Sequence, residues 1–249
     1  MKKYCKVGPL LALLVIQQAS ASNVGNFDGS LRSWNSGDMG ITYATAIAAG
    51  HTIEADESIS AVNLANDTHF VLGEPTVTPG GTQLADLSAW VQAGGILLLY
   101  AESNGGLPAL NNIALGIGSS LAWGGSISSG ATFVGGNFAT EGPPYNLVGQ
   151  SLSTTKGTPV MSGGTPLAGD YIRFEQLGAG YVFGFADRSD HNFFAPTAGN
   201  ANGQLILNIL NSPGHQGHQV PDSNCFPIVW AAVGTGLLIW KHNRRTTSV

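Results

Sequence analysis

The apolar run Ile96–Tyr100 (ILLLY) constrains the fold of this chain more than any other segment. A strand with one solvent-exposed face alternates apolar and polar side chains, but this run has no polar position. It therefore predicts a strand that is buried on both faces, as at the centre of a parallel sheet covered by helices on both sides. The residues before it agree, because Leu84, Leu87 and Val91 repeat at helical spacing and the pattern stops at Gly94.

Strand-like and helix-like segments alternate along the chain, which is the order expected of an α/β domain with a mostly parallel sheet. Each segment is recognised by its apolar spacing and by the glycine or proline that ends it. Residues 117–168 differ, because they are rich in Gly, Ser and Thr and predict long loops with a few short strands. The other predicted elements are helices over residues 39–49 and 202–210, a strand over residues 69–73 and an antiparallel hairpin over residues 171–186.

The first 21 residues have the three parts of a secretory signal in the right order. A lysine-rich start is followed by the uncharged run Val7–Ile16 and by the small residues Ala19 and Ala21, which flank Ser20. The apolar run of about ten residues is too short to span a bilayer. We expect export by Sec-type machinery and cleavage by signal peptidase after Ala21, which makes Ser22 the first mature residue.

The chain closes with fifteen uncharged residues, Phe226–Trp240, and then a basic cluster of Lys241, Arg244 and Arg245. Fifteen helical residues extend ~22 Å, against a hydrocarbon core of ~30 Å. The segment predicts a short transmembrane helix whose interfacial Trp240 and basic cluster hold its end at the cytoplasmic face. The simplest interpretation is a C-terminal membrane anchor.

The segment that precedes this helix suggests a second interpretation. Val220-Pro221-Asp222-Ser223, the apolar helix and the basic end together resemble the PEP-CTERM class of protein-sorting signals, and most closely its VPDSG variant. The chain departs from that variant at Asn224, where the variant has Gly. The resemblance implies recognition by an exosortase-type membrane peptidase, cleavage near the motif, and delivery to the cell surface or the extracellular matrix.

Between these ends lie an α/β domain over residues 22–210 and a polar linker over residues 211–219. The length of the domain suits one hydrophobic core. The only cysteines, Cys5 and Cys225, fall outside the domain, which excludes a thiol nucleophile, a disulfide and a cysteine zinc site within it. Fourteen acidic residues stand against four basic ones between the two targeting ends, a net charge near −10. This charge excludes nucleic acid as a partner.

Two stretches of the domain resemble the class I glutamine amidotransferase-like fold. The first is the strand that ends in Glu74-Pro75, a helix, and Trp90–Ser103; the second is Leu177–Phe194, followed by the helix Asn202–Leu210. The likeness is to the divergent, non-amidotransferase branches that occur in exported bacterial proteins. It implies a flavodoxin-like α/β fold with helices on both faces of the sheet. Amidotransferase chemistry needs a cysteine nucleophile and a histidine after the last strand, but the domain has no cysteine and Asp187 follows the last strand. Glutaminase activity is therefore not expected.

Carboxylates follow three of the predicted strands, and in open α/β sheets ligands bind beyond the carboxyl ends of the strands. Glu74, Glu102 and Asp187 each end an apolar strand, and Asp190 and His191 follow Asp187 closely. Oxygen ligands with one imidazole predict a site for a divalent cation or a sugar, and no other cofactor is expected. The same residue types also cap helices and bind loop amides, so a structural role is the alternative.

Three aromatic residues suggest a platform on which a sugar stacks: Tyr100, Trp90 and Trp123. Trp90 lies on the apolar stripe of a predicted helix, which favours a position in the core instead. Trp123 lies in the Gly- and Ser-rich region and is expected to be exposed.

These patterns leave two functions open. The first is an exported, surface- or matrix-destined protein whose non-catalytic domain contacts polysaccharide or other envelope components. The alternative is a degenerate extracytoplasmic hydrolase of the amidotransferase-like fold, with Glu102, Asp187 and His191 as working residues. The chain has no Gly-x-Ser-x-Gly motif, so a serine hydrolase would need an irregular turn at Ser103 and a base such as His69 or His191.

Overall fold

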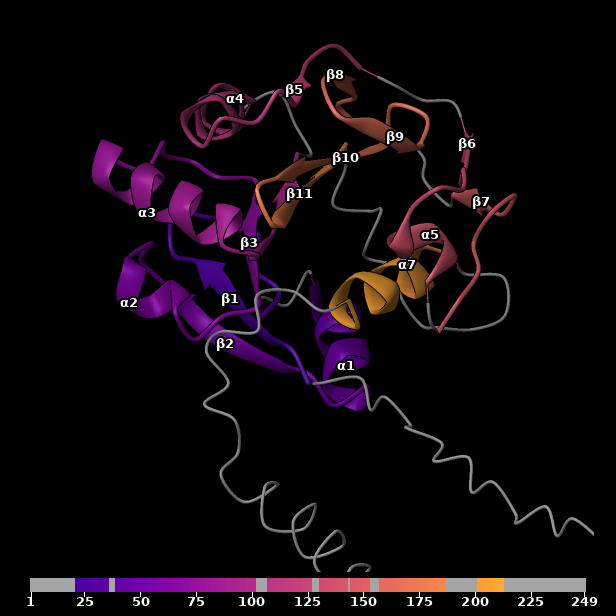
Figure 1. The fold of residues 1–249 in the computed structure, drawn as a ribbon, viewed down its shortest axis with the longest axis horizontal. Coiled ribbons are helices and arrows are strands. Elements are labelled where there is room, and N and C mark those ends of the chain that lie inside the picture. The colour runs from indigo at the N-terminus through magenta and orange to yellow at the C-terminus, as the bar shows by residue number, and fades with distance from the viewer. Residues whose placement is uncertain are drawn as a thin grey trace, which may run out of the picture.

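The computed structural model describes residues 21–35, 39–101, 107–126, 130–142, 144–152, 157–186 and 201–212. Its centre is a seven-stranded sheet in the order β2-β1-β3-β4-β11-β10-β9 (Figure 1). The first five strands in this order are parallel, and β10 and β9 continue the sheet in antiparallel fashion. The strands are β1 (Asn23–Phe27), β2 (Thr52–Glu57), β3 (His69–Gly73), β4 (Ile96–Tyr100), β9 (Thr165–Ala168), β10 (Ile172–Leu177) and β11 (Gly180–Phe185).

Helices cover both faces of this sheet, as predicted. One face carries α2, α3 and α4, and the other carries α1, α5 and α7 (Figure 1). The order of the five parallel strands is that of flavodoxin-like doubly wound sheets. The helices are α1 (Gly40–Ala48), α2 (Ala61–Leu64), α3 (Gly81–Gln92), α4 (Leu107–Gly116), α5 (Phe138–Glu141) and α7 (Ala201–Leu210).

The apolar run that opened the sequence analysis forms β4, in the middle of the sheet. All five of its residues are buried. Leu98 belongs to the core under α1, α5 and α7, whereas Leu97 and Leu99 belong to the core under α2, α3 and α4. Burial of each such leucine stabilises the fold by ~1.5–3 kcal/mol. Because its leucines lie in both cores, β4 belongs to both. The predicted strand with two buried faces is confirmed.

Most other predicted elements are confirmed as well. The helices, the strand over residues 69–73 and the hairpin of β10 and β11 lie within a few residues of their expected bounds. The Gly-rich region forms α5 and two short antiparallel pairs. These pairs join β5 (Ala122–Trp123) to β8 (Val160–Ser162) and β6 (Ala131–Thr132) to β7 (Ser151–Leu152). The sequence patterns did not predict β1, β2 or α2.

The last helix is more deeply buried than its sequence suggests. The apolar spacing predicts one buried face, but all ten residues of α7 are buried. The polar residue Asn208 is satisfied there, because its amide donates to the carbonyls of Ala139 and Tyr145 and accepts from the Tyr145 N–H. The helix therefore packs as a central element of one core and not as a cover on its surface.

Within the described ranges, no helix is long and apolar enough to cross a membrane. The predicted transmembrane segment 226–240, the motif at residues 220–223 and the basic cluster after Trp240 lie outside the described residues, as does the signal sequence up to residue 20. The described chain begins at Ala21, which is exposed, and Ser22, which is buried. The Ser22 hydroxyl donates to the carbonyl of Leu210, so the first and last elements of the domain meet.

Candidate functional site

The carboxyl ends of β3, β4 and β11 lie side by side at one edge of the sheet. Gly73 pairs with Tyr100, and Tyr100 pairs with Phe185, so the residues that follow these strands leave the sheet at one level. Of the predicted site residues, Glu74 is at this edge, directly after β3. The other four lie outside the described residues, and their convergence with Glu74 stays a prediction. They are Glu102, Asp187, Asp190 and His191.

Glu74 has an unusual backbone conformation. Its φ is +50°, and among the described residues it is the only non-glycine with positive φ. Such a conformation costs about 1–3 kcal/mol and persists only where neighbouring bonds enforce it. Here the Glu74 N–H donates to the carbonyl of Tyr100 at 2.9 Å, and the Glu74 carbonyl accepts from the N–H of Leu31 at 3.2 Å. The β1–α1 loop and β4 together fix this residue.

A neighbouring cation faces the Glu74 carboxylate. Arg32 Nε lies 3.7 Å from Glu74 Oε2, and the Glu74 side chain is only 8% exposed while that of Arg32 is 32% exposed. In a site with so little water, this pairing offsets the desolvation of the carboxylate. The ion pair works against the predicted cation site, because Glu74 already faces a positive charge.

The β1–α1 loop fills the point at which flavodoxin-like sheets receive their ligands, between β1 and β3. Its Ser30 hydroxyl accepts from the Gly73 N–H at 3.1 Å, and the Arg32 N–H donates to the Gly73 carbonyl at 3.1 Å. A Cβ on Gly73 would lie 1.9 Å from the Arg32 carbonyl oxygen, so only glycine allows this approach. The protein's own backbone thus occupies this part of the carboxyl edge.

The predicted aromatic platform is wrong. Trp90, Tyr100 and Trp123 are 7%, 1% and 4% exposed, so none of them offers a ring face to solvent. The core position favoured for Trp90 is confirmed. Trp123 was expected to be exposed, but β5 pairs with β8 and lays its ring over Gly184, where a Cβ would lie 2.8 Å from the ring. Its indole N–H donates to the carbonyl of Phe185 at 3.0 Å.

His69 is also misplaced for the catalytic role considered from the sequence. It begins β3 beside Ile96, at the amino edge of the sheet and away from the residues that follow β4. Its Nε2 lies 3.0 Å from the carbonyl of Ile209, and burial lowers the pKa of His69 to about 4. His69 therefore joins the sheet to α7 from the amino edge, which speaks against a catalytic role at the carboxyl edge. Ser103 itself lies outside the described residues.

A buried pair of carboxyls was not foreseen from the sequence. Asp67, which is 2% exposed, lies between α2 and β3, and its Oδ2 occupies the space above Gly25. The partner is Glu57 at the end of β2. Burial, and then the neighbouring Glu57 carboxyl, raise the pKa of Asp67 to about 9. At neutral pH the pair therefore holds a proton. Nothing local in the sequence links these two residues, because only the tertiary fold brings them together.

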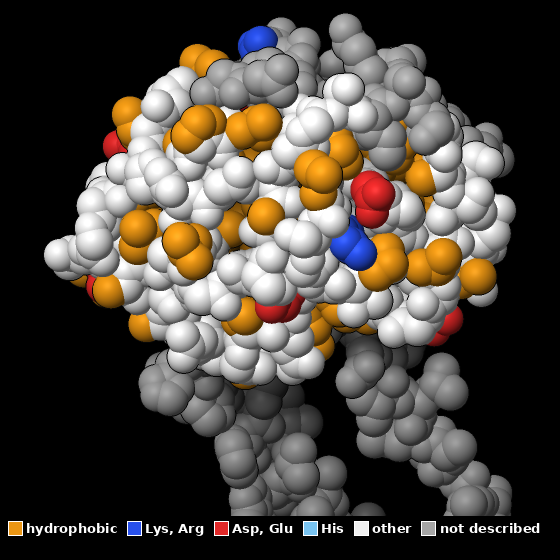
Figure 2. Space-filling model, turned by 90° about the horizontal axis from the view of Figure 1, so that it is seen from above, with side chains coloured by type: hydrophobic (Ala, Val, Ile, Leu, Met, Phe, Trp, Pro, Cys, Tyr) orange, Lys and Arg blue, Asp and Glu red, His pale blue; other side chains and the backbone are white. Residues whose placement is uncertain are grey.

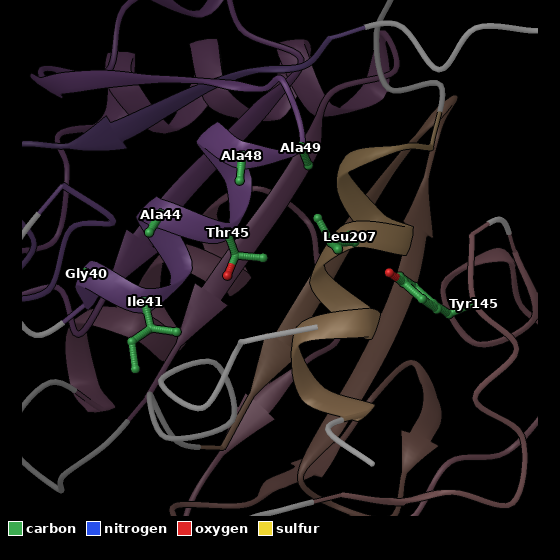
Figure 3. A pocket seen from close by; sticks show the side chains of 8 residues that line it. All are labelled: Gly40, Ile41, Ala44, Thr45, Ala48, Ala49, Tyr145 and Leu207. Carbon is green, nitrogen blue, oxygen red and sulfur yellow. The ribbon is translucent and has the colours of Figure 1, made fainter. Parts of the chain in front are cut away.

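An apolar groove of about 570 Å³ runs between α1 and α7. The described residues that line it carry no charged side chain. Figure 3 shows Leu207 of α7 turned towards α1, with Tyr145 alongside α7. The groove offers surface for binding but no acid or base for catalysis. The residues that line it are Gly40, Ile41, Ala44, Thr45, Ala48, Ala49, Tyr145 and Leu207.

Charged side chains are sparse elsewhere too. Figure 2 looks onto the face at the top of Figure 1, where apolar side chains are scattered among polar atoms and few charges appear. No three His, Cys, Asp or Glu side chains in the described part of the chain form a group that would hold a metal ion.

Comparison with known proteins extends the description of the fold. No protein-family model matches the chain, and no curated protein matches it. Among solved structures, the N-terminal domain of mmIFT52 matches with a TM-score of 0.58 at 10% identity, over 77% of this chain and 98% of that one. The cytoplasmic protein STM3548 from Salmonella typhimurium matches with a TM-score of 0.53 at 10% identity, over 76% of this chain and 97% of that one.

A third match is to part of a much larger enzyme. The β-galactosidase from Rahnella sp. R3 matches with a TM-score of 0.52 at 14% identity, over 76% of this chain but only 31% of the enzyme. At such identities the likeness extends to the fold alone, and proteins of one fold perform many functions. The function must therefore be argued from the residues of this chain.

Proposed function

We propose that this chain is an exported protein whose α/β domain, residues 22–210, serves at the cell surface or in the extracellular matrix as a non-catalytic binding domain. One observation carries the proposal: the β1–α1 loop fills the carboxyl edge between β1 and β3 with the protein's own backbone. An enzyme of this architecture needs that edge open to its substrate. The Arg32–Glu74 ion pair supports the same conclusion, because a positive charge already lies 3.7 Å from one oxygen of the Glu74 carboxylate and opposes a bound cation there.

The binding surface that we assign is the groove between α1 and α7. It combines apolar walls with the ring of Tyr145, which suits the C–H faces of a sugar. The net charge of the segment between the two targeting ends, near −10, opposes polyanions. We therefore propose a neutral polysaccharide or a similarly uncharged envelope component as the ligand.

Delivery follows from the ends of the chain. We propose that residues 1–21 direct export, that residues 226–240 hold the protein in the membrane for a time, and that an exosortase-type peptidase then cuts near Val220–Ser223. The resemblance to PEP-CTERM signals and to the amidotransferase-like fold of exported proteins supports this route. A permanent anchor through residues 226–240 is the alternative end state.

The competing function is a degenerate extracytoplasmic hydrolase. The strained backbone of Glu74 favours it, because left-handed conformations of non-glycine residues cluster at active sites. Such an enzyme would use Glu74 together with Glu102, Asp187 and His191. A divalent cation belongs to this alternative and not to the binding domain.

A binding experiment separates the two functions. The exported protein is titrated calorimetrically with a neutral polysaccharide (dextran) and with a polyanion (alginate), and the mixtures are assayed for new reducing ends. We expect binding of the neutral polymer without turnover. Ala48→Trp, which fills the groove, should weaken binding about tenfold, the effect of ~1.4 kcal/mol. Ala65→Trp is the matched control, an exposed alanine at the end of α2 on the other face of the sheet.

If the wild type hydrolyses a polysaccharide and Glu74→Gln does not, the result would instead support the alternative function, the degenerate hydrolase. The route is tested separately by the intact mass and location of the protein in its native host. A product that ends between Val220 and Asn224 supports sorting, and a membrane-bound product that retains Trp240 supports the permanent anchor.

A further inference from the structure

The residue that follows the predicted cleavage site is bound into the domain. Ser22 is 5% exposed, although Ala21 directly before it is exposed. The Ser22 N–H donates to His51 Nδ1 at 3.1 Å, and its carbonyl accepts from the N–H of Thr52 at 2.9 Å. Its hydroxyl donates to the carbonyl of Leu210. All three polar groups of this one residue therefore have partners: His51 just before β2, the first residue of β2, and the end of α7.

The partner of the Ser22 nitrogen is an uncharged acceptor. His51 is 4% exposed, and burial lowers the pKa of His51, so its ring is neutral at pH 7. A neutral ring that accepts at Nδ1 carries its proton on Nε2. His69 interacts electrostatically with His51, and its pKa is also lowered by burial. Neither β1 nor α7 has an ionisable side chain, and the only one on α1 is Tyr43.

The second part of this site is the end of a helix. Leu210 is the last residue of α7, and the final carbonyls of a helix carry its partial negative charge. A cation is favourable at this position. The site thus combines a neutral imidazole acceptor with a helix end of negative potential.

We propose that removal of the signal peptide creates the ligand for this site: the new α-ammonium group of Ser22 binds between His51 Nδ1 and the carboxyl end of α7. This inference rests on the proposed export and on cleavage after Ala21. Hydrolysis of the Ala21–Ser22 bond consumes one water, leaves a carboxylate on Ala21 and leaves an amine on Ser22 that takes up a proton. Because Ala21 is exposed, its removal leaves the two new N–H groups of the amine facing water. The N–H that donates to His51 Nδ1 keeps its partner.

The folded domain therefore gains this charged contact only after the signal peptide has been removed. In the precursor the site holds a neutral amide N–H, whereas in the mature chain it holds a charge that attracts the end of α7. That helix leads directly into the linker and the C-terminal tail. Removal of the signal peptide at the N-terminus therefore stabilises α7, the helix from which the C-terminal tail continues.

The test compares forms of the chain that differ only at this site. The first is the mature product purified after export of the full chain, the second retains Ala21 as one extra N-terminal residue, and the third is His51→Leu in the mature product. Each is treated with a limiting amount of an amine-acylating reagent at pH 7, and acylation of the N-terminal peptide is followed by mass spectrometry. Lys156 provides an internal reference for reagent activity.

We expect the Ser22 amine to react about tenfold more slowly than the amine of the extended form, the protection given by one charge-assisted hydrogen bond. His51→Leu should remove the protection and speed hydrogen exchange in α7. His51→Gln, which keeps an acceptor oxygen, should restore much of it and guards against a folding defect in the leucine variant.

Equal reactivity of the mature and extended forms would overturn the docking of the amine, while a mass that begins at Ser22 would leave the export proposal standing. A product that begins at another residue would overturn both.

Discussion

Replacing Asp67 by asparagine tests the buried carboxyl pair. The folded state holds a proton on Asp67 up to a pKa of about 9, whereas the ordinary value of the unfolded chain is 3.8. Because the pKa of Asp67 is higher in the folded state, its contribution to stability is complete below pH 3.8. That contribution is lost as the pH rises from 3.8 through 9. At pH 7 the cost of keeping the proton is up to ~4 kcal/mol, from 1.36 kcal/mol for each pH unit above 3.8.

An asparagine side chain has the same shape and donates an N–H to Glu57 without taking up a proton. We therefore expect Asp67→Asn to be more stable than the wild type at pH 7, by up to ~4 kcal/mol, and to be little different at pH 4. Between pH 7 and 9, above the titration range of the histidines, the wild type should lose stability steadily, whereas the variant should have a flat profile over that range. Urea unfolding at five pH values measures both curves.

Asp56→Asn is the matched control, because it makes the same chemical change one residue before Glu57 at an exposed position. Its profile should follow that of the wild type. If Asp67→Asn instead runs parallel to the wild type, or is less stable at pH 7, then the carboxyl pair does not hold a proton and the reasoning fails.

Three further changes test other contacts by thermal or chemical unfolding. Gly25→Ala should destabilise the domain by ~1–3 kcal/mol, since the new Cβ would lie 2.4 Å from Asp67 Oδ2 and 2.6 Å from the ring of Phe70, and pairing it with Asp67→Asn should not rescue it. Gly184→Ala should push against Trp123 and cost a similar amount, with a change in tryptophan fluorescence; an unchanged spectrum would show that the ring lies elsewhere. Because His69 is neutral in the folded state, the unfolded chain binds its proton first as the pH falls. The free energy of unfolding should therefore fall by up to ~3 kcal/mol between pH 6.5 and 4. His69→Gln should flatten that loss.

The sequence predicted those parts of the fold whose signal is local. The strands β4 and β11 are apolar along their length and each follows a glycine turn, so their residues and their neighbours in the chain are sufficient to identify them. The strand β1 was missed because Gly25 and Asn26 argue against a buried strand. In the structure Asn26 is buried with partners on both sides, the carbonyl of Glu54 and the N–H of Trp34. Those partners come from other segments and cannot be seen in the strand itself.

The candidate site was less predictable for the same reason. The position of Glu74 at the carboxyl edge followed from the end of an apolar strand, but its ion pair with Arg32 depends on the course of the β1–α1 loop. The exposure expected for Trp123 was wrong because a Gly- and Ser-rich sequence does not reveal that β5 and β8 pair above Gly184. Composition indicates a loop, whereas burial depends on the surface onto which the loop folds.

The complete burial of α7 has a mechanical consequence for a protein held by its C-terminus. A pull on the tail acts first on Leu210, the last residue of a helix that lies wholly inside one core. Drawing this helix out would expose the apolar surface beneath it, so the domain cannot yield at that end by small steps. If residues 226–240 hold the protein in a membrane as proposed, a load on the tail is resisted by the packing of the core around α7, and a cut in the linker would release the domain intact.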